Sequence, residues 1–175
     1  MPRTPRQAPF LLSLALGPCW EITERTGDSA AFLRLLASTF PEATAAFFEG
    51  SSIGPDVVGI FERHADSGRY LPQPQTLWSI GNILRFRCLF TPALCEALAG
   101  ASLRHAEPEL FDHLFLYAEG VPLLEWPDAL SNCMWIASSI SELRVRPFAT
   151  SSLSDLRAPL KIHCRYCWIS QCGYF

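Results

Sequence analysis

Two apolar runs near the middle of the chain most strongly constrain how it can fold. Residues 113–118 and 121–126 are rich in Leu, aromatic residues and Val, and only Glu119-Gly120 separates them. An acidic residue followed by glycine can adopt the positive φ angles that a tight turn between antiparallel strands requires. The sequence therefore predicts a β-hairpin over 113–126.

The length of the hairpin loop determines which residues face each other across the two strands. A two-residue loop pairs Ala118 with Val121, Leu116 with Leu123 and Leu114 with Glu125 on one face, and Tyr117 with Pro122, Phe115 with Leu124 and His113 with Trp126 on the other. Both faces are largely apolar, so we expect both to be covered. Pro122 cannot donate a ladder hydrogen bond, which favours an edge position for the second strand.

The rest of the chain predicts an α+β fold, with a small antiparallel sheet packed with helices. Besides the hairpin, strands are predicted near residues 10–16, 84–90 and 133–137. Helices are predicted over 29–38, from 54–56 to about 63, over 92–105 and over 139–145, with a further helical turn at 43–48. A chain of 175 residues is one domain by size. We interpret 1–155 as this domain and 156–175 as a Cys-rich tail outside it.

The N-terminal run offers two interpretations. Arg3 and Arg6 precede the apolar residues 9–17, as in a secretory signal, but Pro18 would follow an unfavourable cleavage site. A buried strand and a cytoplasmic location are therefore favoured, with the periplasm as the location if residues 1–17 are a signal peptide. Seven cysteines, an odd number, argue against a disulfide framework and for a reducing compartment. No apolar run reaches transmembrane length.

The C-terminal cysteines suggest one possible metal site. His163, Cys164, Cys167 and Cys172 include thiols spaced to chelate zinc together with a histidine. A structural zinc site usually pairs two such knuckles, and the sequence has no second one. Thiols in a tail are thus the simpler interpretation and no cofactor is expected, while a zinc-stabilised adaptor stays an alternative function.

Titratable residues just before the hairpin suggest a second alternative. His105 and His113 flank Glu107, Glu109 and Asp112, which are groups that can perform acid-base catalysis when a cleft brings them together. A small hydrolase or transferase would use such a site. No nucleophile elbow or phosphate-binding glycine loop accompanies these residues. A charged loop leading into the hairpin explains them equally, so the chain is more simply interpreted as a non-enzyme.

Negative charge is concentrated around the hairpin. Eight carboxylates lie between Glu96 and Glu142, against the single basic residue Arg104, and the net charge of −3 argues against nucleic acid as a partner. Such a region is either a solvated acidic surface or a face that steers a basic protein partner. Under the second interpretation the predicted partner-binding residues are Glu107, Glu109, Asp112, Glu119, Glu125, Trp126 and Asp128.

Several stretches within residues 74–148 resemble the immunity proteins of interbacterial competition, which are small bacterial proteins encoded beside secreted toxins. The stretches are Phe86 to Leu94, Ala106 to Leu114 and Leu123 to Ala129. The resemblance covers under half of the chain and contains no catalytic or ligand motif. It implies a non-enzymatic inhibitor that occludes the active site of a cognate toxin.

Overall fold

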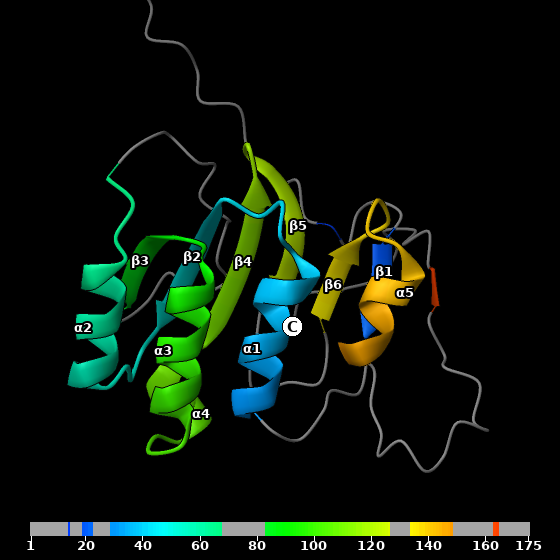
Figure 1. The fold of residues 1–175 in the computed structure, drawn as a ribbon. Helices are drawn as coiled ribbons and strands as arrows, with labels where there is room; N and C mark the ends of the chain where they lie inside the picture. The colour runs from blue at the N-terminus through cyan, green and yellow to red at the C-terminus, as the bar shows by residue number, and fades with distance from the viewer. Residues whose placement is uncertain are drawn as a thin grey trace, which may run out of the picture.

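The computed structural model describes residues 14, 19–22, 29–67, 83–126, 134–148 and 163–164. Within these residues, seven strands form one antiparallel sheet in the order β3-β2-β4-β5-β6-β1-β7 (Figure 1). The strands are β1 (Cys19–Ile22), β2 (Ala45–Gly50), β3 (Leu84–Leu89), β4 (His113–Ala118), β5 (Val121–Trp126), β6 (Met134–Ala137) and β7 (His163–Cys164). The helices are α1 (Ser29–Thr39), α2 (Pro55–Arg63), α3 (Pro92–Ser102), α4 (Glu107–Leu110) and α5 (Glu142–Val145), followed by the 3-10 helix η2 (Arg146–Phe148). The predicted α+β fold class is confirmed.

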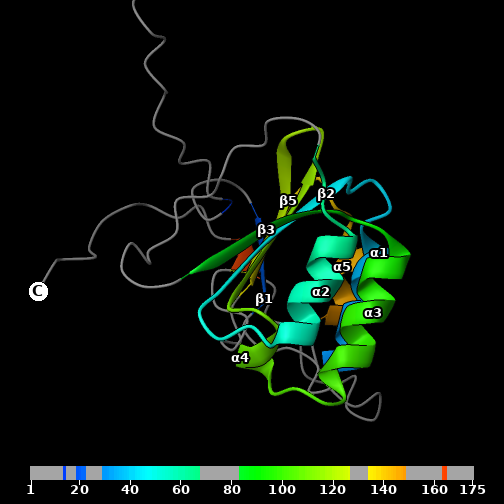
Figure 2. The ribbon, with the colours of Figure 1, turned by 90° about the vertical axis from the view of Figure 1, so that its left-hand side faces the viewer.

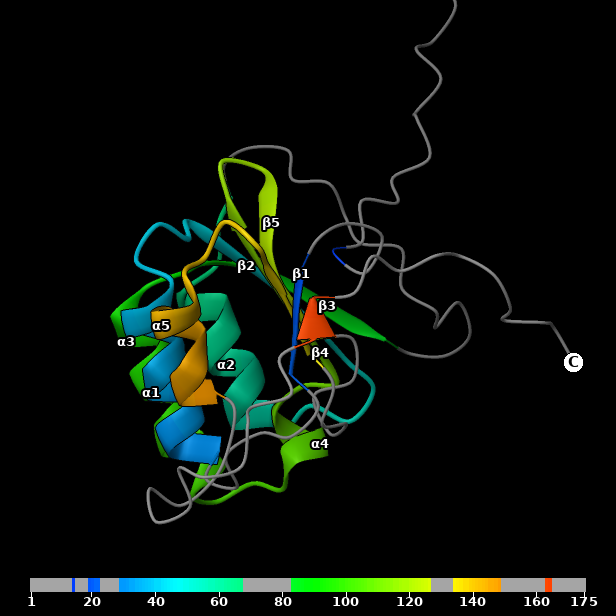
Figure 3. The same cartoon turned by 90° about the vertical axis from the view of Figure 1, so that its right-hand side faces the viewer.

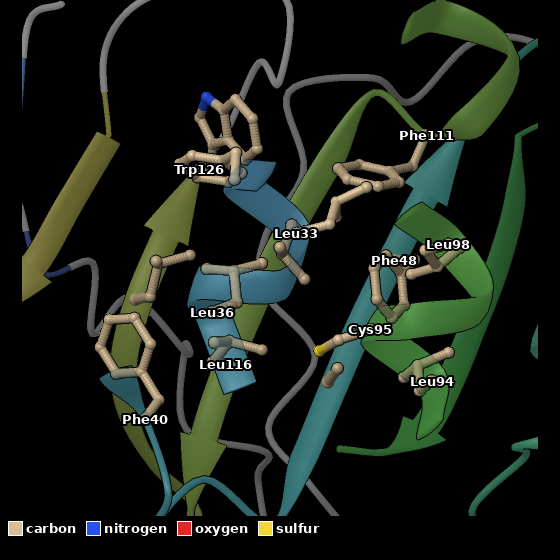
Figure 4. Close-up of a cluster of buried hydrophobic side chains, with 14 of the residues drawn as sticks. Leu33, Leu36, Phe40, Phe48, Leu94, Cys95, Leu98, Phe111, Leu116 and Trp126 are labelled. Atoms are coloured by element: carbon tan, nitrogen blue, oxygen red, sulfur yellow. The ribbon is translucent and has the colours of Figure 1, made fainter. Parts of the chain in front are cut away.

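The helices cover one face of the sheet. Figure 2, which views the sheet nearly edge-on, shows α1, α2, α3 and α5 on the same side, and Figure 3 shows this layer from the opposite direction. The main hydrophobic core fills the space between the two layers (Figure 4). It includes Leu33 and Leu36 from α1, Phe48 from β2, Leu94 and Leu98 from α3, and Leu116 from β4.

Local sequence signals explain where two of these helices begin. Thr91 caps α3, since its Oγ1 accepts a hydrogen bond from Leu94 N at 3.2 Å, and Pro92 occupies the first turn. Proline also lies in the first turn of α2, where Asp56 places a negative charge at the positive end of the helix dipole. Both starts agree with the prediction.

The predicted hairpin is present as β4 and β5. Its turn has φ angles of 49° at Glu119 and 85° at Gly120, so both central residues are in the left-handed region, as in a type I′ turn. The predicted pairing is correct only near this turn. Between Leu116 and Tyr117 the register shifts by one residue, and Leu116 pairs with Leu124 instead of Leu123.

This register shift changes which residues face the helices. Leu123 is the extra residue of the bulge, and both Leu123 and Leu124 belong to the main core. Farther along β5, Glu125 pairs with Phe115 and Trp126 pairs with Leu114. Trp126 consequently lies on the helix-covered face and Glu125 on the opposite face.

The position of β5 corrects the inference drawn from Pro122. This strand lies in the interior of the sheet between β4 and β6 and is not an edge strand. The ladder between β5 and β6 contains only Leu124 and Glu125, so it ends before it reaches Pro122. Pro122 has no backbone N–H, and at this position β6 requires none.

Residues 43–48 correct a second prediction, because Ala45–Gly50 forms β2 and not a helical turn. All six residues of β2 are buried, since the strand lies between β3 and β4 with helices over one face. A strand buried on both faces has a continuous apolar sequence, which periodicity does not distinguish from a buried helix. Strand β1 was not predicted at all.

The two ends of the chain fall largely outside the described residues. Of the strand predicted near 10–16, the structure describes only Leu14, and it leaves out residues 1–13 and 15–18. In the predicted tail, His163 and Cys164 form β7 and pair with Glu21 and Trp20 of β1. These two residues therefore take part in the sheet, and the boundary between domain and tail stays a prediction.

Candidate functional site

The hairpin tip, defined here as residues 118–121, projects beyond the neighbouring strands (Figure 1). The pairing of β2 with β4 ends at Tyr117, and the pairing of β6 with β5 begins only at Leu124. Thr44 supports the base of the tip, because its backbone N–H donates to Tyr117 O at 2.8 Å. The side chain of Glu119 is exposed and Val121 is 60% exposed. The tip thus presents one carboxylate beside one apolar side chain.

Glu125 and Trp126, both predicted to bind a partner, are buried. Trp126 is 2% exposed, and its ring lies 4.7 Å from that of Phe32 and 6.1 Å from that of Phe111, centroid to centroid. Glu125 is 6% exposed, and its Oε2 accepts a hydrogen bond from Leu14 N at 2.9 Å. Neither side chain is available at a surface, because the bulge in β5 directs Trp126 into the core.

Two of the other predicted acidic residues, Asp112 and Glu119, lie at opposite ends of β4. Asp112 precedes the strand, and its Oδ2 accepts hydrogen bonds from Ser51 N at 2.8 Å and Ser51 Oγ at 2.9 Å. Glu119 follows the strand, which spans roughly 20 Å at about 3.4 Å per residue. The side chain of Glu107 and the whole of Asp128 lie outside the described part of the chain. The described carboxylates therefore do not form one continuous patch.

The histidines proposed for catalysis have different surroundings. The ring of His105 contacts two carboxylates, with Nε2 2.8 Å from Asp56 Oδ1 and Nδ1 3.1 Å from Glu109 Oε2. His113 lies in β4, where it pairs with Glu49 of β2 and is 7% exposed. Both ring nitrogens of His105 are thus engaged in the fold, and the two histidines lie in different elements, His105 after α3 and His113 in β4.

The sheet face away from the helices carries polar groups that sequence reasoning missed. Glu49 is 1% exposed, and its Oε1 accepts a hydrogen bond from Arg85 Nε at 2.6 Å. Its Oε2 has no hydrogen-bond partner within the part of the chain that the structure describes. Burial raises the pKa of the nearby Tyr117 hydroxyl, and the carboxylates of Glu125 and Glu49 raise it further. An Arg in β3 opposite an acid in β2 was the available signal, but it required β2 to be recognised as a strand.

Aromatic rings accompany these polar groups on the same face. Phe47, Phe115 and Tyr117 form a second, smaller buried cluster, and the rings of Phe47 and Phe115 lie 6.3 Å apart. Buried charges require partners, so the Glu49–Arg85 ion pair is needed wherever this face is covered. The face thus combines a small aromatic cluster with an ion pair whose Glu49 end is buried and whose Arg85 end is 46% exposed.

The four predicted zinc ligands lie only partly within the described residues. His163 and Cys164 are in β7, whereas Cys167 and Cys172 lie outside the described residues. Across the described ranges no group of three or more His, Cys, Asp or Glu residues is arranged to hold a metal ion. Burial raises the pKa of the Cys88 and Cys95 thiols to about 12 each, which keeps both protonated.

Among the described helices, none is long and apolar enough to cross a membrane. Comparison of the chain with protein-family models, with curated proteins and with solved structures finds no match.

Proposed function

We propose that this chain is a protein-binding inhibitor of the immunity type, which neutralises a basic toxin by occluding its active site. The observation that carries the proposal is the hairpin tip, where exposed Glu119 and Val121 project beyond the neighbouring strands. A tight two-residue turn has fewer residues to order on entering a concave site than a longer loop, so it loses less conformational entropy there. The net charge of −3 favours a basic partner, because opposite charges speed association and reject acidic competitors.

Because Trp126 and Glu125 are buried, the part of the hairpin that we propose as contact surface is its tip. In this arrangement the carboxylate of Glu119 pairs with a cationic group of the toxin, and Val121 fills an apolar position beside it. Hot spots in interfaces combine a desolvated apolar anchor with a few charged pairs. A hydrolase or transferase gains no support, since both ring nitrogens of His105 already contact carboxylates.

The test is binding to, and protection from, a basic toxin encoded beside the gene for this chain. The toxin is co-expressed with the wild-type chain and with Glu119→Arg, while cell growth reports protection and calorimetry reports the dissociation constant. Reversal of the charge on Glu119 is expected to weaken binding at least tenfold, which corresponds to about 1.4 kcal/mol. Val121→Asp is expected to weaken binding in the same direction.

Glu62→Arg is the matched control, because Glu62 is an exposed acid on α2, away from the hairpin. This substitution changes the net charge by the same amount and should leave binding within about twofold of wild type. If neither product of the flanking genes binds or is neutralised, the proposed function is refuted. If binding occurs but both tip variants bind as tightly as wild type, the proposed surface is refuted.

A further inference from the structure

His105 lies between two carboxylates from different helices. Its Nε2 is 2.8 Å from Asp56 Oδ1 and 2.9 Å from Asp56 Oδ2, and its Nδ1 is 3.1 Å from Glu109 Oε2. Ionised carboxylates only accept hydrogen bonds, and a neutral imidazole has one donor nitrogen and one acceptor nitrogen. Both contacts are therefore satisfied together only when the ring carries protons on both nitrogens.

The ring sits where three helices meet. Asp56 is in the first turn of α2, Glu109 is in α4, and His105 follows the end of α3. A backbone bond joins the same elements, since Gly54 N donates to Glu109 O at 2.9 Å. A Cβ atom on Gly54 would lie 3.1 Å from His105 Cε1, so the chain entering α2 rests directly against the ring. The state of this ring thus bears on how α2 docks against α4.

The charges around the ring favour its protonated form. The groups that face it are Asp56 from α2, Glu109 from α4 and Arg104, whose Nη2 is 3.3 Å from Asp56 Oδ2. The hydrogen bond to Asp56 raises the pKa of His105 most, and the bond to Glu109 raises it further. The contact between His105 and Asp56 also lowers the pKa of Asp56. Without the charge on the ring, two carboxylates would face a single cation.

We propose that His105 is a pH-dependent latch that holds the first turn of α2 against α4 while its ring is protonated. When the ring loses a proton, one nitrogen becomes an acceptor, and one of the two carboxylates then faces a lone pair at about 3 Å. That contact changes from attractive to repulsive, and the junction between α2 and α4 loosens. The latch is independent of the hairpin tip.

The direction of the pH effect follows from linkage. A histidine with a folded-state pKa above its unfolded value of about 6.5 stabilises the fold fully below that pH. The stabilisation is lost as the pH rises through the folded-state pKa. The junction is consequently closed in weak acid and loosens on the alkaline side. The carboxylates of Asp56 and Glu109 are about half exposed, so added salt should weaken the latch.

Amide hydrogen exchange tests the latch at the junction itself. The reporters are the amides of Gly54 and Ala106, which donate to Glu109 O and to Glu109 Oε2 respectively. Between pH 6 and pH 9, after correction for intrinsic exchange, their protection in the wild-type chain should fall about tenfold for each unit by which the folded-state pKa of His105 exceeds 6.5. The titration of the His105 ring by nitrogen NMR in the same chain should have a midpoint above that value.

Two substitutions at His105 separate its charge from its packing. His105→Arg keeps a cation with several donors and should retain protection at pH 9, whereas His105→Gln has no charge and should show low protection throughout. His64→Gln, at the other end of α2, is the control and should retain the wild-type pH dependence. The latch is refuted if protection in the wild type does not change with pH, if His105 titrates at or below 6.5, or if His105→Gln retains the wild-type pH dependence.

Discussion

Replacement of Trp126 tests whether this residue belongs to the core or to a binding surface. Its side chain is 2% exposed and packs between Phe32, at 4.7 Å, and Phe111, at 6.1 Å between ring centroids. Removal of a buried Trp side chain costs about 3–5 kcal/mol, because apolar contact is lost and a cavity remains. Aromatic pairs contribute about 0.5–1.5 kcal/mol beyond their buried area, which places Trp126→Ala towards the upper part of that range.

That loss is large compared with the total stability of a natural domain, about 5–15 kcal/mol. Trp126→Phe retains one ring in the same place and should cost less, about 1–2 kcal/mol. Stability is measured by urea unfolding followed by far-ultraviolet circular dichroism, since the chain has five Trp residues and their fluorescence would overlap. The unfolding midpoint should fall in the order wild type, Trp126→Phe, Trp126→Ala, with little change in the slope.

Leu143→Ala provides the control, because Leu143 is apolar but 79% exposed. Its effect should lie within about 0.5 kcal/mol of zero. An unchanged midpoint together with lost binding to a partner in Trp126→Ala would contradict the core position of Trp126, because Trp126 would then act as a surface anchor. A loss of binding in proportion to the unfolded fraction would instead agree with its place in the core.

Three further predictions concern buried or strained positions. Arg85→Met leaves Glu49 buried without its cation, so the unfolding free energy should fall by about 2 kcal/mol. The double variant Arg85→Met with Glu49→Leu should recover most of this loss in the same urea titration. If stability is not recovered, the loss does not come from the unpaired charge on Glu49. Gly120→Ala should lower stability by about 1 kcal/mol because φ is 85° at this position, and a neutral effect would show that the turn adopts another conformation. Burial raises the pKa of the Cys88 and Cys95 thiols to about 12, so neither should react with iodoacetamide at pH 8 until denaturant is added. Peptide mass spectrometry measures the labelling, and labelled native protein would contradict the burial of these thiols.

The elements set by local chemistry were predictable from the sequence. The turn at Glu119-Gly120 forms because both residues tolerate a positive φ. Helix α3 begins where it does because Thr91 caps its N-terminus and Pro92 occupies its first turn. Each signal depends only on residues that are neighbours in the chain, so the turn and the helix start do not depend on how the rest of the chain folds. The hairpin, the main helices and the α+β class could all be inferred at this level.

The register of the hairpin was not predictable in the same way. Both faces of β4 and β5 are largely apolar, so a shift of one residue exchanges one apolar face for another. The sequence pattern therefore does not favour one pairing over the other. In the folded chain both Leu123 and Leu124 belong to the main core, and the register shifts by one residue at this bulge. This single shift removed Trp126 from the predicted binding surface. Strand β2 was missed for a related reason, since a strand buried on both faces has no alternation.

Local sequence patterns therefore account for the individual helices and strands, and the composition accounts for the acidic character of the chain. The tertiary structure alone decided which polar groups meet. Glu49 in β2 contacts Arg85 in β3, 36 residues later in the chain. Asp56 contacts His105, 49 residues later, at a junction of three helices. Spacing along the chain carries no information about such pairs, because they depend on strand order and helix packing. The exposed tip at Glu119 remains the candidate surface because the rest of the hairpin is buried in the fold.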